Sequence, residues 1–99
     1  MELSLNAETV APGSLSAVEA GGESLAIANI DGSFYAISNV CTHRGCSISE
    51  GSVSGTELTC VCHGARFDLR TGEVLGGPAR ESLKTYPVSV SDGNVIVVV

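Results

Sequence analysis

The chain has 99 residues, a length typical of one domain with a modest hydrophobic core. Its formal net charge of −6 argues against nucleic-acid binding, and its longest purely aliphatic run, 95–99, is far too short to span a membrane. Residues 1–5 lack the basic region and long apolar core of a signal peptide, so we expect a soluble, cytoplasmic protein.

Short apolar segments separated by turn residues predict strands throughout the N-terminal part of the chain. The clearest hairpin has Asp31-Gly32 between two apolar runs, a dipeptide that strongly favours a two-residue turn. Another turn is predicted at 11–14, and Gly21-Gly22 ends a strand. The strands expected in this part are 3–5, 14–18, 25–30 and 34–37.

More strands are predicted after a glycine-containing bridge over residues 44–59. Within the bridge we expect Val53 and Leu58 to be buried and a short helical turn near 47–50. No window shows helical periodicity, so the sequence predicts an all-β fold. The remaining expected elements are strands 65–69 and 73–75 around a turn at 70–72, a tight loop at 76–78, and strands 83–90 and 94–99 around Ser91-Asp-Gly93.

Four side chains with metal-binding chemistry lie in two short arms, Cys41-Thr-His43 and Cys60-Val-Cys62-His63. Sixteen residues separate His43 from Cys60, and each arm offers one thiolate and one imidazole as ligands. Thiolate and imidazole suit zinc or an iron–sulfur cluster, whereas calcium and magnesium prefer oxygen ligands. The sequence therefore predicts a four-ligand metal site.

The two arms and their surroundings resemble the Rieske [2Fe-2S] family. The similar positions, densest over 39–90, are Cys41-Thr-His43-Arg-Gly-Cys46, Cys60-Val-Cys62-His63-Gly-Ala-Arg-Phe67-Asp, Thr71-Gly72, Gly77-Pro78-Ala79, Leu83, Tyr86 and Val88. The resemblance implies a single domain over 1–99, a small antiparallel β-sandwich with the cluster-binding loops of about 40–80 at one tip and a basal sheet from the remainder. The implied ligands of one 2Fe–2S cluster per chain are Cys41 and Cys60 on one iron and His43 and His63 on the other.

Histidine ligation has a chemical consequence for such a cluster. Two ferric ions, two sulfides and two thiolates sum to zero charge, so an electron is added more easily than to an all-thiolate cluster, and the potential rises. Gly45 and Gly64 lie beside ligands, where backbone N–H groups can approach the cluster sulfurs without an intervening Cβ. The resemblance also implies that the loop of Gly76, Gly77 and Pro78 covers the cluster from a third side.

Structural zinc is the alternative use of two cysteines and two histidines. Zinc sites usually take their ligands as a cysteine pair and a histidine pair, each with its own short spacing. In this chain each arm mixes the two ligand types. The mixed arms therefore favour the iron–sulfur cluster over zinc.

The remaining cysteines, Cys46 and Cys62, lie one in each arm. The resemblance to Rieske proteins of cytochrome bc complexes implies a disulfide between them that pins the two loops together. Many ferredoxins of ring-hydroxylating oxygenases lack this pair, and cytosolic disulfides are uncommon. Two reduced thiols, packed as small apolar groups, are the alternative.

Ala65 and Phe67 stand where high-potential respiratory Rieske proteins carry Ser and Tyr, whose hydroxyls donate hydrogen bonds to cluster and ligand sulfurs. Because neither residue has a hydroxyl, the reduced cluster loses stabilisation, and we expect a potential of about −150 mV, low in the family range. Tyr86 is expected in the core, and Asp68 is expected to accept hydrogen bonds at a turn or strand end.

Charge is unevenly distributed along the chain. Residues 1–40 carry five acidic and no basic side chains, a net −5, whereas 41–99 carry six acidic and five basic ones, a net −1. A strongly acidic docking face around the metal is therefore not predicted. Arg44 and Arg66, next to the arms, either help to dock an acidic partner or are solvated surface side chains.

Taken together, the resemblance implies a low-potential Rieske ferredoxin, a monomeric one-electron carrier that is not itself an enzyme. By resemblance, its partners are a flavin-dependent ferredoxin reductase and a terminal oxygenase of the aromatic-ring-hydroxylating type. Two alternatives keep the cluster: a small Rieske subunit of a nitrite reductase, and a soluble Rieske domain of a respiratory or arsenite-oxidising complex. A zinc-stabilised binding module is the alternative from a different functional class.

Overall fold

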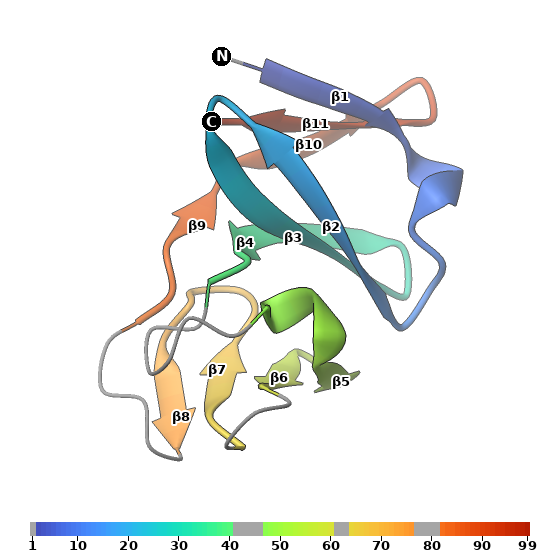
Figure 1. Ribbon diagram of the computed structural model, residues 1–99. Helices are drawn as coiled ribbons and strands as arrows, with labels where there is room; N and C mark the ends of the chain where they lie inside the picture. Colours follow the sequence, from blue (N-terminus) through green and yellow to red (C-terminus); the bar gives the residue numbers. More distant parts are fainter. Residues whose placement is uncertain (1, 41–46, 61–63, 77–81) are drawn as a thin grey trace.

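The computed structural model describes residues 2–40, 47–60, 64–76 and 82–99. In these residues, eleven short strands form three antiparallel sheets, and two 3-10 helices lie between strands (Figure 1). The all-β architecture predicted from the sequence is thus confirmed. The described residues contain no helix that is long and apolar enough to cross a membrane.

Two sheets make up the basal part of the molecule, with strand orders β1-β11-β10 and β2-β3-β4-β9. Their strands are β1 (Glu2–Asn6), β2 (Ser14–Ala20), β3 (Glu23–Ile30), β4 (Ser33–Ser38), β9 (Thr85–Tyr86), β10 (Val88–Ser91) and β11 (Asn94–Val98). A 3-10 helix that the sequence did not predict, η1 (Ala7–Thr9), follows β1, and the Asn6 side chain caps it by accepting a hydrogen bond from Glu8 N.

The third sheet, called here the distal sheet, has the order β5-β6-β7-β8 and lies below the basal sheets in the view of Figure 1. Its strands are β5 (Ser52–Ser54), β6 (Glu57–Thr59), β7 (Arg66–Asp68) and β8 (Val74–Gly76), preceded by the 3-10 helix η2 (Ile48–Glu50). The helical turn predicted near 47–50 is therefore confirmed. Leu58 is fully buried, as expected, whereas Val53 is only half-buried.

Both Asp-Gly turns predicted from the sequence are present. The φ angles are 52° at Asp31 and 89° at Gly32, and 51° at Asp92 and 76° at Gly93. Left-handed backbone at both central residues is the requirement of the type I′ turn, whose twist matches that of the flanking strands. These two turns fix the register of β3 with β4 and of β10 with β11.

The single strand predicted over 83–90 is wrong, because the structure has two strands in this stretch. β9 pairs with β4 in one basal sheet, and β10 pairs with β11 in the other. Pro87 lies between them, and its lack of an N–H donor breaks the hydrogen-bond ladder. The chain therefore passes from one sheet to the other at this residue.

Tyr86 is buried in the basal core, as expected. Its hydroxyl donates a 2.6 Å hydrogen bond to Glu23 Oε2 at the start of β3. Burial, reinforced by this hydrogen bond, raises the pKa of Tyr86 to about 12. Lys84 Nζ lies 3.5 Å from the other carboxylate oxygen of Glu23, so the three side chains tie β9 to β3.

β3 is buried on both faces, because successive side chains of a strand point to opposite sides. Leu25 and Ile27 belong to a basal core, whereas Ala26 and Ala28 belong to a distal core. The other buried members of the basal core are Val10, Ala36, Tyr86, Val95 and Val97. Those of the distal core are Ile37, Ile48, Leu58, Cys60, Ala65, Phe67, Leu69 and Leu83.

Candidate metal centre

Cys60 is the predicted ligand that lies within the described residues. It follows β6 directly and is 1% exposed, among the apolar side chains of the distal core. Its N–H donates a 2.7 Å hydrogen bond to the Ala65 carbonyl oxygen, and its own carbonyl oxygen accepts one of 3.1 Å from Gly64 N. These two bonds fix the backbone on both sides of residues 61–63.

Gly64 begins the described stretch that follows residues 61–63. Its N–H donates to the Cys60 carbonyl oxygen, a partner that the sequence did not predict. A Cβ at Gly64 would meet no protein atom within 4 Å among the described residues. The φ angle of +74° favours glycine at this position, because glycine adopts this left-handed conformation without steric cost.

The segment that carries the first arm, 41–46, is bracketed by described residues that pair with one another. Val40 and Ser47 form an antiparallel bridge, and Ile48 N donates a 2.8 Å hydrogen bond to the Asn39 carbonyl oxygen. Ile48 is itself fully buried in the distal core. The ends of this segment are therefore anchored to the same core that holds Cys60.

A third anchor joins the turn between β7 and β8 to the stretch that leads into β9. Gly72 N donates to the Asp68 carbonyl oxygen at 2.6 Å, and Leu83 N donates to the Gly72 carbonyl oxygen at 2.7 Å. Gly72 has a φ of +76°, and a Cβ there would overlap the Leu83 carbonyl oxygen. Only glycine allows the two backbones to approach this closely.

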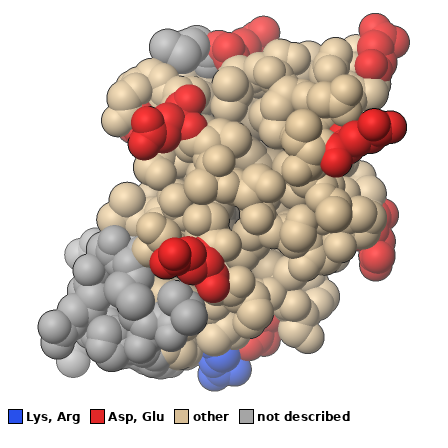
Figure 2. Space-filling model, turned by 45° about the vertical axis from the view of Figure 1, so that its right-hand side comes forward, with Lys and Arg blue, Asp and Glu red and all other residues tan. Residues whose placement is uncertain are grey.

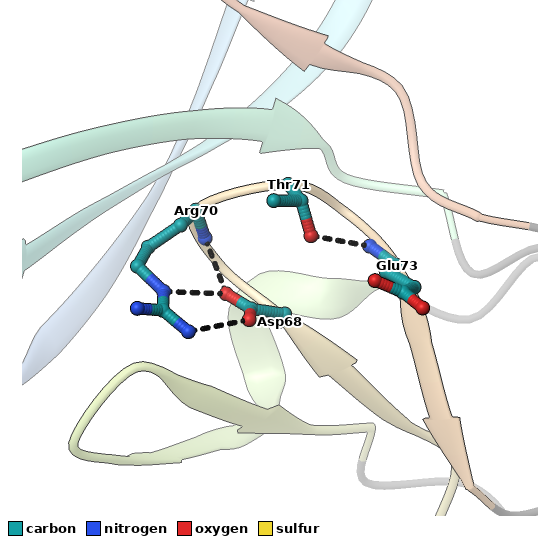
Figure 3. A network of polar contacts seen from close by, with 4 residues as sticks. All are labelled: Asp68, Arg70, Thr71 and Glu73. Atoms are coloured by element: carbon teal, nitrogen blue, oxygen red, sulfur yellow. Dashed lines mark hydrogen bonds and ion pairs between the residues drawn. The ribbon is translucent and has the colours of Figure 1, made fainter.

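Side chains of the same turn form the network drawn in Figure 3. The Asp68 carboxylate accepts hydrogen bonds from Arg70 N at 2.8 Å, Nε at 3.2 Å and Nη2 at 2.9 Å, which confirms its predicted role. These bonds hold the pKa of Asp68 below its usual range. Glu73 N donates to Thr71 Oγ1 at 3.2 Å. The network fixes the start of β8, and sequence reasoning did not single out Arg70.

Ala65 and Phe67 both lie inside the distal core, 1% and 0% exposed. Phe67 on β7 is paired with Leu58 on β6, in register across the distal sheet. Neither side chain brings a hydroxyl to the core beside Cys60, in line with the sequence analysis. Apolar groups fill the positions on which the predicted low potential depends.

Arg66 does not present an unpaired charge for docking. Its Nη1 lies 3.3 Å from Glu57 Oε1, and both side chains are about half exposed. The other basic side chains within the described ranges, Arg70 and Lys84, are likewise paired with carboxylates. Acidic side chains are scattered singly over the face shown in Figure 2, so no strongly acidic patch forms on this face.

The loop predicted at 76–78 starts with a residue that the structure places in a strand. Gly76 belongs to β8 rather than to the predicted tight loop. A hollow of about 280 Å3 borders Cys60 and is lined by Glu50, Gly51, Ser52, Thr59, Cys60 and Gly64.

The predicted site residues outside the described ranges are Cys41, His43, Arg44, Gly45, Cys46, Cys62, His63, Gly77 and Pro78.

Comparison with known proteins adds independent observations. Residues 3–87 match the Rieske [2Fe-2S] domain family. The ferredoxin component of the naphthalene 1,2-dioxygenase system of Pseudomonas putida is 36% identical over 85 residues, 86% of this chain and 82% of that protein. The 3-phenylpropionate/cinnamic acid dioxygenase ferredoxin subunit of Photorhabdus laumondii is 45% identical over 76 residues, 76% of this chain and 72% of that one.

Solved structures show the same fold. The Sphingomonas yanoikuyae B1 ferredoxin superposes with a TM-score of 0.91 at 34% identity, over 98% of this chain and 97% of that one. A chain from the complex of reduced oxygenase and oxidized ferredoxin in carbazole 1,9a-dioxygenase gives a TM-score of 0.91 at 33% identity, over 97% of this chain and 100% of that one.

Proposed function

Because this chain belongs to the Rieske [2Fe-2S] family, we propose that it carries single electrons from a flavin-dependent ferredoxin reductase to a terminal oxygenase of the aromatic-ring-hydroxylating type. The observation that supports this most directly is the match to ferredoxin components of dioxygenase systems, which covers most of both chains. The proposal includes one Rieske domain over 1–99, acting as a soluble, cytoplasmic monomer without an activity of its own.

The chain binds a 2Fe–2S cluster, and we assign Cys41, His43, Cys60 and His63 as its ligands. The described part fits this cofactor, since the Cys60 thiol is buried among apolar side chains on a backbone fixed by hydrogen bonds. Two thiolates and two imidazoles are the donor set of such a centre. When bound, the cluster supplies a group that accepts and releases one electron.

The residues around the ligands hold them in place. Hydrogen bonds of Cys60 with Gly64 and Ala65 join the two sides of residues 61–63. The bridge between Val40 and Ser47 joins the two sides of segment 41–46. Preorganised ligands need little rearrangement when the charge of the site changes, which favours rapid transfer. The zinc alternative and the other Rieske complexes are less well supported, because the curated relatives described above are oxygenase ferredoxins.

The proposed function is tested with the purified chain, the reductase and an oxygenase of this class. We expect iron and acid-labile sulfide in equal amounts and a midpoint potential of about −150 mV. Reduced protein should be reoxidised in stopped flow by the oxygenase with its aromatic substrate and oxygen present, and Cys60→Ser should abolish cluster binding. Zinc without sulfide would refute the cluster, and a potential near the upper family limit would refute the oxygenase assignment.

The Cys46–Cys62 disulfide remains a prediction. Replacing both residues by serine should leave a cluster that assembles but bleaches faster on heating, because a crosslink between the two loops restricts their opening. The measurement is the loss of visible absorbance with temperature, for the variant and for the unmodified chain. Equal loss of visible absorbance with temperature in the two proteins would show that no such bond stabilises the site.

A further inference from the structure

Asn39 is one of two buried polar residues in the described part of the chain, and it is 6% exposed. It lies just after β4, immediately before the Val40–Ser47 bridge that closes segment 41–46. Its side chain uses both of its polar atoms. Oδ1 accepts a 2.7 Å hydrogen bond from Ser49 N, and Nδ2 donates one of 3.2 Å to Ser24 Oγ.

The backbone of Asn39 makes two more hydrogen bonds, to Ser24 again and to Ile48, the residue before Ser49. Its N–H donates to the Ser24 carbonyl oxygen at 2.9 Å, and its carbonyl oxygen accepts from Ile48 N at 2.8 Å. One residue thus connects three pieces of chain: the start of β3, the end of β4 and the start of η2. Two of these pieces are the entry and the exit of segment 41–46.

We propose that Asn39 is a positioning residue for the cluster, because it fixes both ends of the segment that carries Cys41 and His43. The inference rests on the ligand assignment made under the proposed function. A short segment whose ends are joined samples few conformations, so its ligands stay in the arrangement that binds iron. Groups that orient ligands in this way alter metal affinity about 10–100-fold when they are removed.

Without the Asn39 side chain, the Ser49 N–H in the first turn of η2 loses its acceptor. A partly buried donor without a partner favours local rearrangement that brings water or another acceptor to it. The exit of the segment then moves relative to β3, although the bridge between Val40 and Ser47 still connects its ends. The effect should therefore appear at the cluster and not only in overall stability.

Asn29 offers a matched control within the same chain. It is 5% exposed and also uses both polar side-chain atoms, since Nδ2 donates to the Val10 carbonyl oxygen at 2.8 Å and Oδ1 accepts from Gly32 N at 2.8 Å. These bonds hold the connection between η1 and β2, which contains Val10, and the β3–β4 turn. Asn29→Ala thus removes an equally buried amide with the same number of bonds, away from the proposed ligands.

The experiment compares the holoprotein with Asn39→Ala, Asn39→Asp and Asn29→Ala. We measure iron and sulfide content, the EPR g values after reduction, the rate of cluster loss to a chelator, and the thermal unfolding temperature. Asn39→Ala should lose its cluster at least about tenfold faster and show shifted g values. Asn29→Ala should lower the unfolding temperature but leave the g values and the loss rate unchanged.

Asn39→Asp should lose its cluster to the chelator about as slowly as the unmodified chain does. Its carboxylate still accepts from Ser49 N, and the Ser24 hydroxyl can donate to the oxygen that replaces Nδ2. If Asn39→Ala does not fold, Asn39→Ser, which is too short to reach both partners, takes its place. Cluster loss and g values equal to those of Asn29→Ala would overturn the inference. An unmodified chain without iron and sulfide would overturn the proposed function as well.

Discussion

Gly72→Ala is expected to destabilise the folded protein by roughly 3 kcal/mol or more, a large effect for a single methyl group. The added Cβ would occupy a left-handed position at φ +76° and would overlap the Leu83 carbonyl oxygen. Thr85 Cγ2 lies 3.1 Å from the same Cβ position, which adds a second close contact. The hydrogen bond from Leu83 N to the Gly72 carbonyl oxygen, 2.7 Å long, would be disrupted.

Gly93→Ala is the control that separates backbone strain from steric overlap. Gly93 has the same φ of +76°, but a Cβ there meets no atom within 4 Å. We expect a loss of about 1 kcal/mol from backbone strain alone. Thermal unfolding of both variants gives the comparison, since 1 kcal/mol shifts the melting temperature by about 4–8 °C in a domain of this size. Equal shifts for the two variants would show that the contact with Leu83 does not constrain the turn.

Ala65→Ser combined with Phe67→Tyr is expected to raise the midpoint potential by more than about 100 mV. A hydrogen bond to a charged group contributes about 1.5–3 kcal/mol, and about 1.4 kcal/mol corresponds to 59 mV for one electron. Both positions are buried in the distal core with Cys60, so hydroxyls added there are shielded from water. Shielded donors stabilise added negative charge more strongly than exposed ones do.

Phe34→Tyr supplies the control, since Phe34 and Phe67 are the two phenylalanines of the chain. Phe34 packs against the basal core, so a hydroxyl there should leave the potential unchanged. Protein-film voltammetry of the three proteins measures the effect, and thermal unfolding shows whether the buried hydroxyls have found acceptors. An unchanged potential in the double variant would refute the argument that the missing hydroxyls set the potential.

Most strands were predictable because their signals are local. The apolar runs around Asp31-Gly32 and around Ser91-Asp-Gly93 specify both hairpins without reference to the rest of the fold. The break at Pro87 was missed, because 83–90 was read as one strand although a proline interrupts it. The partner strand on each side of the proline is decided by tertiary packing.

The proposed metal ligands rest on a different kind of signal, since residue identity and spacing reflect the chemistry of the metal. No such signal marks the residues around the site. Asn39 and Gly72 act through contacts with Ser49, Ser24 and Leu83, each of which is ten or more residues away in the sequence. The bond from Gly64 N to the Cys60 carbonyl oxygen was not foreseen either, because a glycine beside a ligand does not show which acceptor its N–H has.

The two-sided burial of β3 has a consequence for how this protein unfolds. Side chains from one strand fill both cores, so neither half can lose its packing without exposing the apolar face of the other. The two halves should therefore melt as one cooperative unit, and the amides of 25–28 should exchange with deuterium only through global opening. Heating would then release the cofactor and melt the basal sheets in a single transition.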